Sequence, residues 1–216
     1  MSRFTHLIFD LDGTLVDSKA DLAAATNVML ESCGLAPLSI EKVTSYVGDG
    51  ARVLVERALG PEHAHLVPQG FAVFMEYYLA HSLDHTRPYD GIPQLLSAAR
   101  ARGIILSVLT NKPEAPSRAI LEGAGLAHFF HTVVGGDTLP VRKPDPRGVF
   151  HLQKLTKVAS EATLLIGDSP VDVKTGEAAG IATCGVTWGF GAQGLMATPP
   201  EFVVDSVEEL QRVVLE

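Results

Sequence analysis

Short apolar runs alternate with longer amphipathic stretches over most of the chain. Five runs are rich in aliphatic residues and end in a polar or glycine-rich turn: residues 7–9, 104–109, 132–134, 163–166 and 181–186. Apolar positions recur at helical spacing in residues 91–102, 116–122, 147–155 and 171–179. Continuously apolar strands are typical of a parallel sheet that is buried on both faces. The alternation therefore predicts the α/β class, with a doubly wound parallel sheet.

Residues 17–86 interrupt this alternation. Four stretches there have helical spacing, and none of the segments between them reads as a convincing strand: residues 21–33, 40–47, 51–59 and 71–82. Because the interruption directly follows the first strand, we predict an α-helical cap of residues 17–86, inserted into a catalytic core of residues 1–16 and 87–216. Open α/β sheets bind ligands outside the carboxyl ends of their strands, so such a cap would cover the ligand site.

Composition narrows the classes of partner. The 216 residues are 46% hydrophobic and carry a net charge of −8, which fits a globular protein and argues against nucleic-acid or anionic-membrane partners. A bound metal ion could still attract an anionic substrate. No apolar run has the length of a signal peptide or a membrane span, and Cys33 and Cys184 lie far apart. We therefore expect two buried free thiols and a cytoplasmic location.

Two carboxylates follow the first apolar run. Asp10 and Asp12, at positions i and i+2 of an extended chain, face the same side, and Gly13 permits a tight turn after them. Their charges would repel each other unless a hard divalent cation lay between them. An Asp-rich turn that caps a helix is the alternative explanation.

Polar groups also follow three further runs. Thr110 and Asn111 follow the second, Lys143 follows the third beside a proline, and Asp168 with Asp172 follows the fourth. A hydroxyl and a lysine can bind phosphate oxygens, and a carboxylate can bind a metal ion. Each group alone also fits an ordinary turn, a solvated loop or a helix N-terminus. The ordered recurrence at four strand ends favours one shared site.

The segments DLDGT (10–14), LTN (109–111), KPDP (143–146) and GDSPVD (167–172) together resemble the motifs of the haloacid dehalogenase superfamily. The resemblance covers essentially the whole chain and implies a Rossmann-like core with a small helical cap. It implies Asp10 as nucleophile, Asp12 as general acid and base, and Thr110 and Lys143 as phosphate-binding residues. It further implies Mg²⁺ held by Asp10, Asp168 and the backbone carbonyl of Asp12. Additional roles would fall to Leu11 and Asn111 at the phosphate, and to Ser169 and Asp172 behind the metal ligands.

Asp12 indicates the reaction class. Dehalogenases of the superfamily lack an acid two residues after the nucleophile, because a halide leaves without a proton. A carboxyl group here can protonate an alkoxide leaving group and then deprotonate water. We therefore expect a Mg²⁺-dependent phosphomonoester hydrolase that acts through an aspartyl-phosphate at Asp10 on a small phosphorylated metabolite.

Further segments are similar to phosphoglycolate phosphatases, among them residues 46–51, 109–113 and 135–140. On this resemblance we expect Gly48 and Arg52 to reach the substrate from the cap and 2-phosphoglycolate to be the substrate. Asp49 stands where that family usually has Asn, and it adds a negative charge. A plain helix–helix turn is the alternative for residues 48–50.

Other functions stay open. A phosphatase of a sugar phosphate or of pyrophosphate shares the same core, as does a phosphoglucomutase-type phosphotransferase. A phosphonatase would need a cap lysine, for which Lys19 and Lys42 are the candidates. A non-catalytic phosphate- or metal-binding module would be expected to lack some of the motif residues. We predict a monomer or homodimer and a packing role for Trp188. We expect the cap histidines to be solvated or to lie at helix ends, with a transition-metal site as the alternative: His63, His65, His81 and His85.

Overall fold

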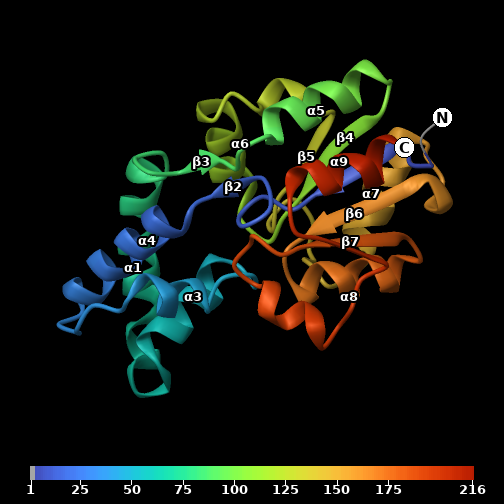
Figure 1. Ribbon diagram of the computed structural model, residues 1–216. Helices are drawn as coiled ribbons and strands as arrows, with labels where there is room; N and C mark the ends of the chain where they lie inside the picture. Colours follow the sequence, from blue (N-terminus) through green and yellow to red (C-terminus); the bar gives the residue numbers. More distant parts are fainter. Residues whose placement is uncertain (1–2) are drawn as a thin grey trace.

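A six-stranded parallel sheet forms the centre of the protein, whose computed structural model describes residues 3–216 (Figure 1). The strands run in the order β5-β4-β1-β6-β7-β8. Their bounds are β1 His6–Phe9, β4 Ile105–Leu109, β5 Thr132–Val134, β6 Thr163–Gly167, β7 Ala182–Val186 and β8 Phe202–Val204. Because β1 lies between β4 and β6, the residues that follow these three strands meet at one edge of the sheet.

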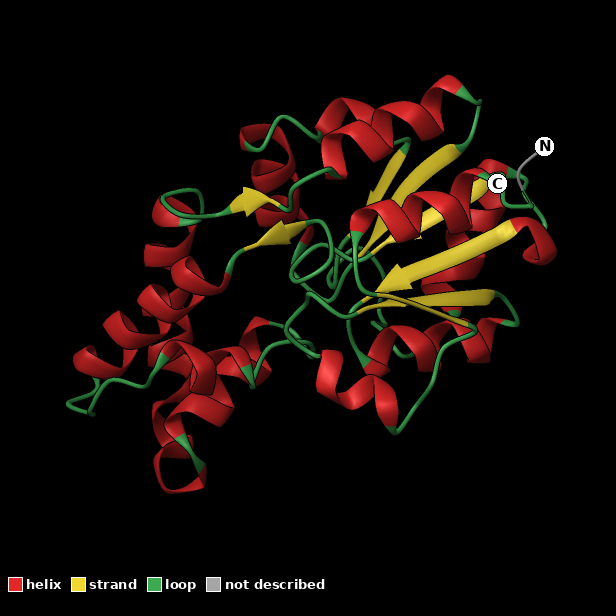
Figure 2. Cartoon of the chain, in the orientation of Figure 1, coloured by secondary structure: helices red, strands yellow, loops and turns green. Residues whose placement is uncertain are grey.

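Helices cover both faces of the sheet (Figure 2). Leu7 and Phe9 of β1 belong to a core shared with α5, α6 and α9, whereas Ile8 belongs to a core shared with α7 and α8. This alternation of side chains along β1 is the packing of a doubly wound α/β protein, so the predicted class is confirmed. The bounds are α5 Ile92–Ala101, α6 Glu114–Gly123, α7 Arg147–Thr156, α8 Pro170–Ala179 and α9 Val207–Leu215. Short 3₁₀ helices span Ala127–Phe129, Ser160–Ala162 and Ala192–Met196.

A second group of helices follows β1 and lies at the edge where the strands end (Figure 1). It comprises α1 Lys19–Ser32, α2 Ile40–Thr44, α3 Ala51–Leu59, a 3₁₀ helix Pro61–Leu66 and α4 Val67–His81. We call residues 19–81 the cap. Met29, Leu54, Phe74 and Tyr78 are buried in it, and they belong to the same apolar cluster as Leu7 and Phe9 of β1. The boundaries proposed from the sequence, at residues 16–17 and 86–87, stay a prediction.

The two connections between core and cap are paired. β2 (Val16–Asp17) and β3 (Arg87–Pro88) form a short antiparallel ribbon that the sequence analysis did not predict. Next to it, the buried carboxylate of Asp21 accepts hydrogen bonds from the backbone N–H groups of His85 and Thr86 and from Thr86 Oγ1. These contacts hold together the two segments that connect the core to the cap.

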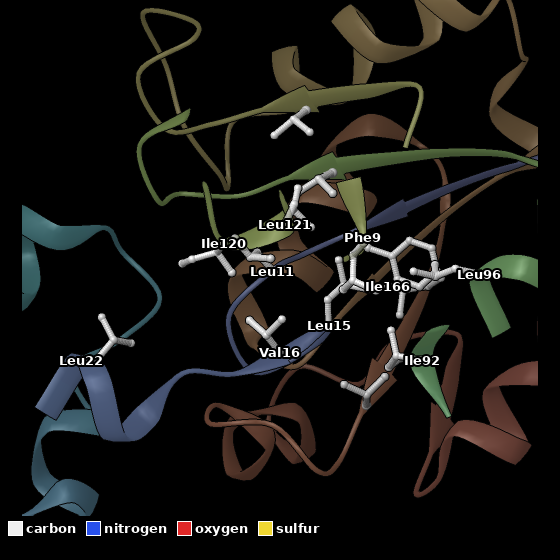
Figure 3. Packing of buried hydrophobic residues seen from close by; sticks show 14 of the residues in the cluster. Phe9, Leu11, Leu15, Val16, Leu22, Ile92, Leu96, Ile120, Leu121 and Ile166 are labelled. Carbon is white, nitrogen blue, oxygen red and sulfur yellow. The ribbon is translucent and has the colours of Figure 1, made fainter. Parts of the chain in front are cut away.

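Apolar side chains anchor the loop that follows β1 (Figure 3). Leu11 and Leu15 are fully buried, as are Phe9 and Ile166 on the neighbouring strands. Since Leu11 separates Asp10 from Asp12, its burial fixes the backbone between the two carboxylates.

Two further predictions concern the cysteines and the membrane. Both thiols are free, but only Cys184 is buried; Cys33, at the end of α1, is half-buried. Among residues 3–216, no helix is both long and apolar enough to span a membrane. The cytoplasmic location stays a prediction.

Candidate active site

The four predicted motifs converge at the carboxyl ends of the central strands. Asp10 follows β1, Thr110 and Asn111 follow β4, Lys143 lies in the segment after β5, and Asp168 follows β6. All five are buried at 9% exposure or less. A close approach of the Gly13 backbone to the Asp168 side chain permits this convergence: a Cβ on Gly13, whose φ is +81°, would lie 2.5 Å from Asp168 Oδ2. Only glycine fits that turn.

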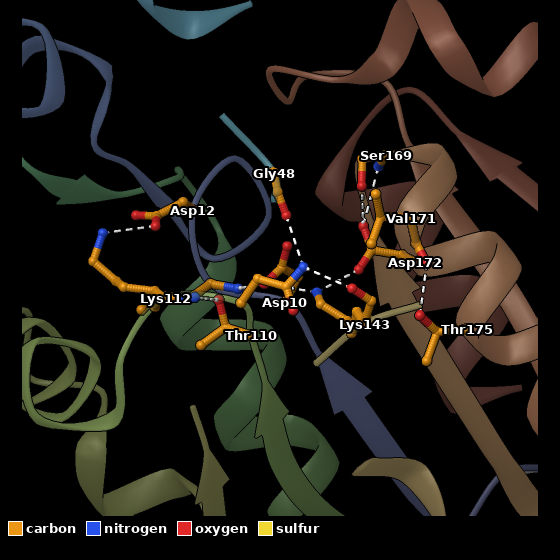
Figure 4. Close-up of polar contacts among 12 residues, drawn as sticks. Asp10, Asp12, Gly48, Thr110, Lys112, Lys143, Ser169, Val171, Asp172 and Thr175 are labelled. Carbon is orange, nitrogen blue, oxygen red and sulfur yellow. Dashed lines mark hydrogen bonds and ion pairs between the residues drawn. The ribbon is translucent and has the colours of Figure 1, made fainter. Parts of the chain in front are cut away.

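Lys143 joins two of the carboxylates (Figure 4). Its Nζ lies 3.0 Å from Asp10 Oδ1 and 2.6 Å from Asp172 Oδ1. Burial alone would lower the pKa of Lys143, but Asp10 and Asp172 outweigh it and hold that pKa above its usual range. The lysine therefore stays charged, and it can neutralise negative charge that develops at Asp10.

Three carboxylates form an acidic cluster. Oxygens of Asp10, Asp168 and Asp172 lie within 4.8 Å of one another, and this is the one such group of possible ligands in the described residues. Burial, followed by the charges of Asp172 and Asp10, raises the pKa of Asp168 to about 7. Burial also raises the pKa of Asp10, while Lys143 acts in the opposite direction. The single charge of Lys143 leaves this cluster with an excess of negative charge, so the residues fit a hard divalent cation.

Neighbouring groups fix Asp168 and Asp172. The backbone N–H of Gly191 donates to Asp168 Oδ2 at 2.9 Å. Ser169 and Asp172 form a capping box at the start of α8, with Ser169 Oγ donating to Asp172 Oδ2 at 2.7 Å. Asp172 thus binds both the helix terminus and Lys143, which suits the supporting position expected for it.

Asp12 has a different environment from Asp10. Its Oδ1 accepts a hydrogen bond from Ser18 Oγ at 2.6 Å, and its Oδ2 lies 2.7 Å from Lys112 Nζ. Figure 4 shows this pair on the opposite side of Asp10 from Lys143 and Asp172. The side chain of Asp12 therefore does not join the acidic cluster, and the expectation that its backbone carbonyl binds a metal stays a prediction.

Lys112 was absent from the predicted site. It follows Asn111 directly, and a lysine in a polar turn is usually solvated. Here it is 8% exposed, because the cap covers it and Tyr78 of α4 places its ring centroid 4.5 Å from Lys112 Nζ. Burial would lower the pKa of Lys112, but Asp12 outweighs it and holds that pKa above its usual range.

A cleft lies between the cap and the strand ends. Its volume is about 700 Å³, counting the part open to solvent, and both Asp10 and Asp12 line it. The core also contributes Thr110, Asn111, Lys112, Pro113, Pro116, Asp168, Ser169, Phe190 and Gly191. The cap contributes mainly apolar residues and the turn before α3, namely Leu22, Val47, Gly48, Gly50, Ala51, Leu54, Phe74, Met75 and Tyr78. A cleft of this size suits a small metabolite.

The turn at residues 48–50 is in contact with the core. Asn111 Nδ2 donates to the carbonyl of Gly48 at 2.9 Å. A Cβ on Gly50, whose φ is +95°, would lie 3.1 Å from the Asn111 carbonyl oxygen. The carboxylate of Asp49 is paired with Arg57 at 2.5 Å, and Asp49 does not line the cleft. Its charge is thus balanced within the cap.

Other predicted residues lie elsewhere. Arg52 is paired with Glu56 at 3.2 Å on an exposed surface and does not line the cleft. Leu11 contributes its backbone N–H, which donates to Asp10 Oδ1 at 2.8 Å, while its side chain is buried. Neither cap lysine reaches the cleft: Lys19 pairs with Asp17, and Lys42 lies over the ring of Tyr46.

The aromatic and histidine predictions are also resolved. Trp188 Nε1 donates to the Thr14 carbonyl at 3.3 Å, and the ring packs near Tyr89, so it has a packing role; its neighbour Phe190 lines the cleft instead. His81 is paired with Asp84, and His63 is bonded to the Leu59 carbonyl. The cap histidines form no metal-binding group within the described residues.

This combination of a parallel α/β core, a helical cap and an acidic strand-end site defines a class of phosphate-transferring hydrolases. Comparison with known proteins agrees: residues 7–186 match the family model described as haloacid dehalogenase-like hydrolase. The chain belongs to this family, and it is a phosphoric monoester hydrolase.

Relatives at moderate identity cover nearly the whole chain. Phosphoglycolate phosphatases from Pseudomonas putida and Neisseria meningitidis are each 39% identical over 94% of this chain, covering 77% and 90% of those proteins. The crystal structure of a predicted phosphoglycolate phosphatase from Haemophilus somnus 129pt matches with a TM-score of 0.93 at 31% identity, covering 99% of both chains.

Proposed function

We propose that this phosphatase hydrolyses 2-phosphoglycolate through an aspartyl-phosphate at Asp10. The observation that carries the proposal is the separation of roles between two neighbouring carboxylates. Asp10 contacts Lys143 and the acidic cluster, whereas Asp12 is held apart by Ser18 and Lys112 with its side chain at the cleft. Two carboxylates in unlike environments suit a nucleophile and an acid–base group.

In the first half-reaction, a carboxylate oxygen of Asp10 attacks phosphorus, and the bond between phosphorus and the leaving oxygen breaks. Asp12 donates its proton to that oxygen, which leaves as the alcohol. In the second, Asp12 takes a proton from water as the water oxygen attacks phosphorus, and the acyl-phosphate bond breaks. Inorganic phosphate leaves and Asp10 is regenerated. Lys143, 3.0 Å from Asp10, stays charged throughout and stabilises the phosphoryl oxygens.

The metal ion we propose is Mg²⁺, held by Asp10, Asp168 and the backbone carbonyl of Asp12, with Asp172 and Ser169 behind them. Three buried carboxylates with one lysine fit it, since oxygen ligands suit a hard cation. When bound, such an ion neutralises charge on the transferring phosphoryl group. Thr110 and Asn111 lie at the end of β4 in the cleft and are proposed to bind the phosphate with the Leu11 N–H.

The substrate proposal rests on the relatives and on the turn at residues 48–50. The P. putida and N. meningitidis proteins are phosphoglycolate phosphatases, and the turn at residues 48–50 reaches the cleft next to Asn111. We propose that the cap closes over this substrate, with Gly48 facing it. For Arg52 the same role would require its ion pair with Glu56 to break.

Phosphate release from a panel of phosphomonoesters tests the proposal. The panel holds 2-phosphoglycolate, pyrophosphate, glucose 6-phosphate and a nucleotide, each with Mg²⁺ and with EDTA. We expect Mg²⁺-dependent release with 2-phosphoglycolate preferred, and complete loss in Asp10→Asn. The matched control is Asp84→Asn, at an exposed carboxylate that pairs with His81. Full activity of Asp10→Asn would refute the nucleophile, and a preference for sugar phosphate or pyrophosphate would refute the substrate.

A further inference from the structure

Lys112 is a buried cation that the proposed reaction uses only to hold Asp12 in place. Its Nζ is bound to Asp12 Oδ2 at 2.7 Å, and its side chain reaches the cleft from the end of β4. Among the cleft-lining residues of the described chain it is the one cationic side chain. Burying an ammonium is costly unless its charge and its donors are used.

The hydrogen-bond donors of Lys112 are not used up by the protein. An ammonium has three N–H donors, and the hydrogen bonds formed by the described residues account for one, to Asp12. On its cap side lies the ring of Tyr78, whose centroid is 4.5 Å from Nζ. Even when an interaction with the Tyr78 hydroxyl is counted, the described residues leave at least one N–H donor of Lys112 available next to Asp12.

Tyr78 supplies a second, independent observation. The residue is 2% exposed and lines the cleft; its hydroxyl lies next to Lys112, and no hydrogen bond of good geometry satisfies that hydroxyl in the described residues. Buried hydroxyl groups in folded proteins are nearly always paired, and an unpaired one calls for a missing partner. The other cap side chains that line the cleft, among them Leu22, Phe74 and Met75, are apolar and cannot supply that partner.

We propose that Lys112 and Tyr78 form the subsite for the carboxylate of the substrate, which selects phosphates of small 2-hydroxy acids. This inference rests on the proposed function. The phosphorus lies at Asp10 and the leaving oxygen at Asp12 in that reaction. A carboxylate one carbon beyond the leaving oxygen therefore comes next to the group that Asp12 itself contacts, Lys112 Nζ.

The chemistry of the subsite favours a carboxylate over a hydroxyl. Carboxylate oxygens can accept from both the ammonium and the phenol, and a charge-assisted bond is about twice as strong as a neutral one. A sugar phosphate would place a neutral hydroxyl there and leave the remaining donors of Lys112 without an anion. A missing partner in a site built for hydrogen bonds costs more affinity than a missing apolar contact.

Two substrates that differ only at this position test the subsite. 2-Phosphoglycolate carries the carboxylate, and 2-hydroxyethyl phosphate carries a CH₂OH group in its place. We expect Tyr78→Phe to lower kcat/KM for 2-phosphoglycolate about tenfold, mainly through KM, and Lys112→Met to lower it about 100-fold. In both variants the loss of kcat/KM for 2-hydroxyethyl phosphate should be several times smaller. The ratio of kcat/KM for 2-phosphoglycolate to that for 2-hydroxyethyl phosphate therefore falls.

Matched variants control for packing and charge. Tyr77→Phe changes the preceding tyrosine of α4, which stacks on His81 and does not line the cleft. Lys154→Met removes an exposed lysine of α7. Both should keep the wild-type ratio. Lys112→Met also removes the partner of Asp12, and this variant can fail to fold. In that case Tyr78→Phe alone still tests the subsite.

Equal losses on both substrates in Tyr78→Phe and in a folded Lys112→Met would overturn the subsite, because Lys112 would then only orient Asp12. A wild-type preference for 2-hydroxyethyl phosphate would overturn it as well, while the phosphatase reaction would stand. Absence of phosphate release from every ester by the Mg²⁺-loaded wild-type protein would instead refute the proposed function.

Discussion

The side-chain amide of Asn111, in the core, donates hydrogen bonds to the carbonyl of Gly48 in the cap at 2.9 Å and to the carbonyl of Lys143 in the core at 3.0 Å. One side chain thus connects the cap turn, the end of β4 and the segment that carries the active-site lysine. Arg142 ties the same turn to the core, since its Nη1 donates to the Asp49 carbonyl at 3.2 Å.

We expect Asn111→Ala to raise KM about tenfold or more, because the variant loses two hydrogen bonds of about 1 kcal/mol each and uncouples the cap turn from Lys143. Steady-state kinetics with the preferred substrate measure this. The control is Asn27→Ala, which removes two hydrogen bonds to the backbone of Leu38 inside the cap. Asn27→Ala should lower thermal stability and leave KM unchanged, and equal KM values for the two variants would contradict the coupling.

The acidic cluster predicts stabilisation by a divalent cation. Asp10, Asp168 and Asp172 repel one another in the absence of a cation, and a cation that binds only the folded state raises the free energy of unfolding. At about 100 times its Kd, Mg²⁺ should add about 2.7 kcal/mol and raise Tm by roughly 2–4 °C per kcal/mol. Differential scanning calorimetry with Mg²⁺ and with EDTA measures the shift.

Asp168→Asn should abolish that shift, whereas Asp84→Asn, at an exposed position, should retain it. The same Mg²⁺-dependent shift in Asp168→Asn as in the wild type would show that the ion binds elsewhere.

The sequence predicted the site residues best where a polar side chain directly follows an apolar strand. Asp10, Thr110 and Asp168 each come directly after a buried run, and parallel strands bring such positions to one edge of the sheet. Lys112 also lies just after a strand, but it was not predicted as a site residue. Its burial depends on a contact with Tyr78 of the cap, which is distant in the sequence. Arg52 is the opposite case. It was predicted to reach the substrate because it lies close to the turn at residues 48–50, but it forms an ion pair with Glu56 on its own helix.

The missed elements have two different causes. β2 and β3 are two residues each and too short for any periodicity; they exist because the connections run side by side. The helix α9 did have a signal. Ser206 accepts from the Glu209 N–H, and Glu209 Oε2 accepts from the Asp205 N–H, so a Ser three residues before a Glu marks its start.

The hinge between core and cap depends on Asp21. This carboxylate is 2% exposed and accepts from two backbone N–H groups and one hydroxyl at residues 85 and 86. Asp21→Ala leaves those donors buried without a partner and should destabilise the protein by about 3 kcal/mol. Urea unfolding measures the loss. Glu56→Ala, which breaks a surface pair, should have a much smaller effect, and equal losses would contradict the role of Asp21.

We expect the free energy of unfolding to fall in acid because of His6. It lies at the start of β1, is 0% exposed, and its Nε2 is 3.0 Å from Ser107 Oγ. Burial, with a smaller contribution from His131, lowers the pKa of His6 from 6.5 to about 4. As the pH falls from 6.5 to 4, the unfolded chain binds a proton that the folded protein does not, so the free energy of unfolding decreases and the loss is complete below the folded-state pKa.

The loss over this window is about 3 kcal/mol, which follows from the difference between the two pKa values. Urea unfolding of the wild type and of His6→Asn between pH 4 and 7 measures it. Asn can keep a hydrogen bond to Ser107 and does not titrate, so the curve of the variant should be flatter in this window. His65→Asn, at an exposed histidine of the cap, should follow the wild-type slope. Parallel curves for wild type and His6→Asn would mean that His6 is not the group that senses acid, because only a residue with unlike pKa values in the two states can change the slope.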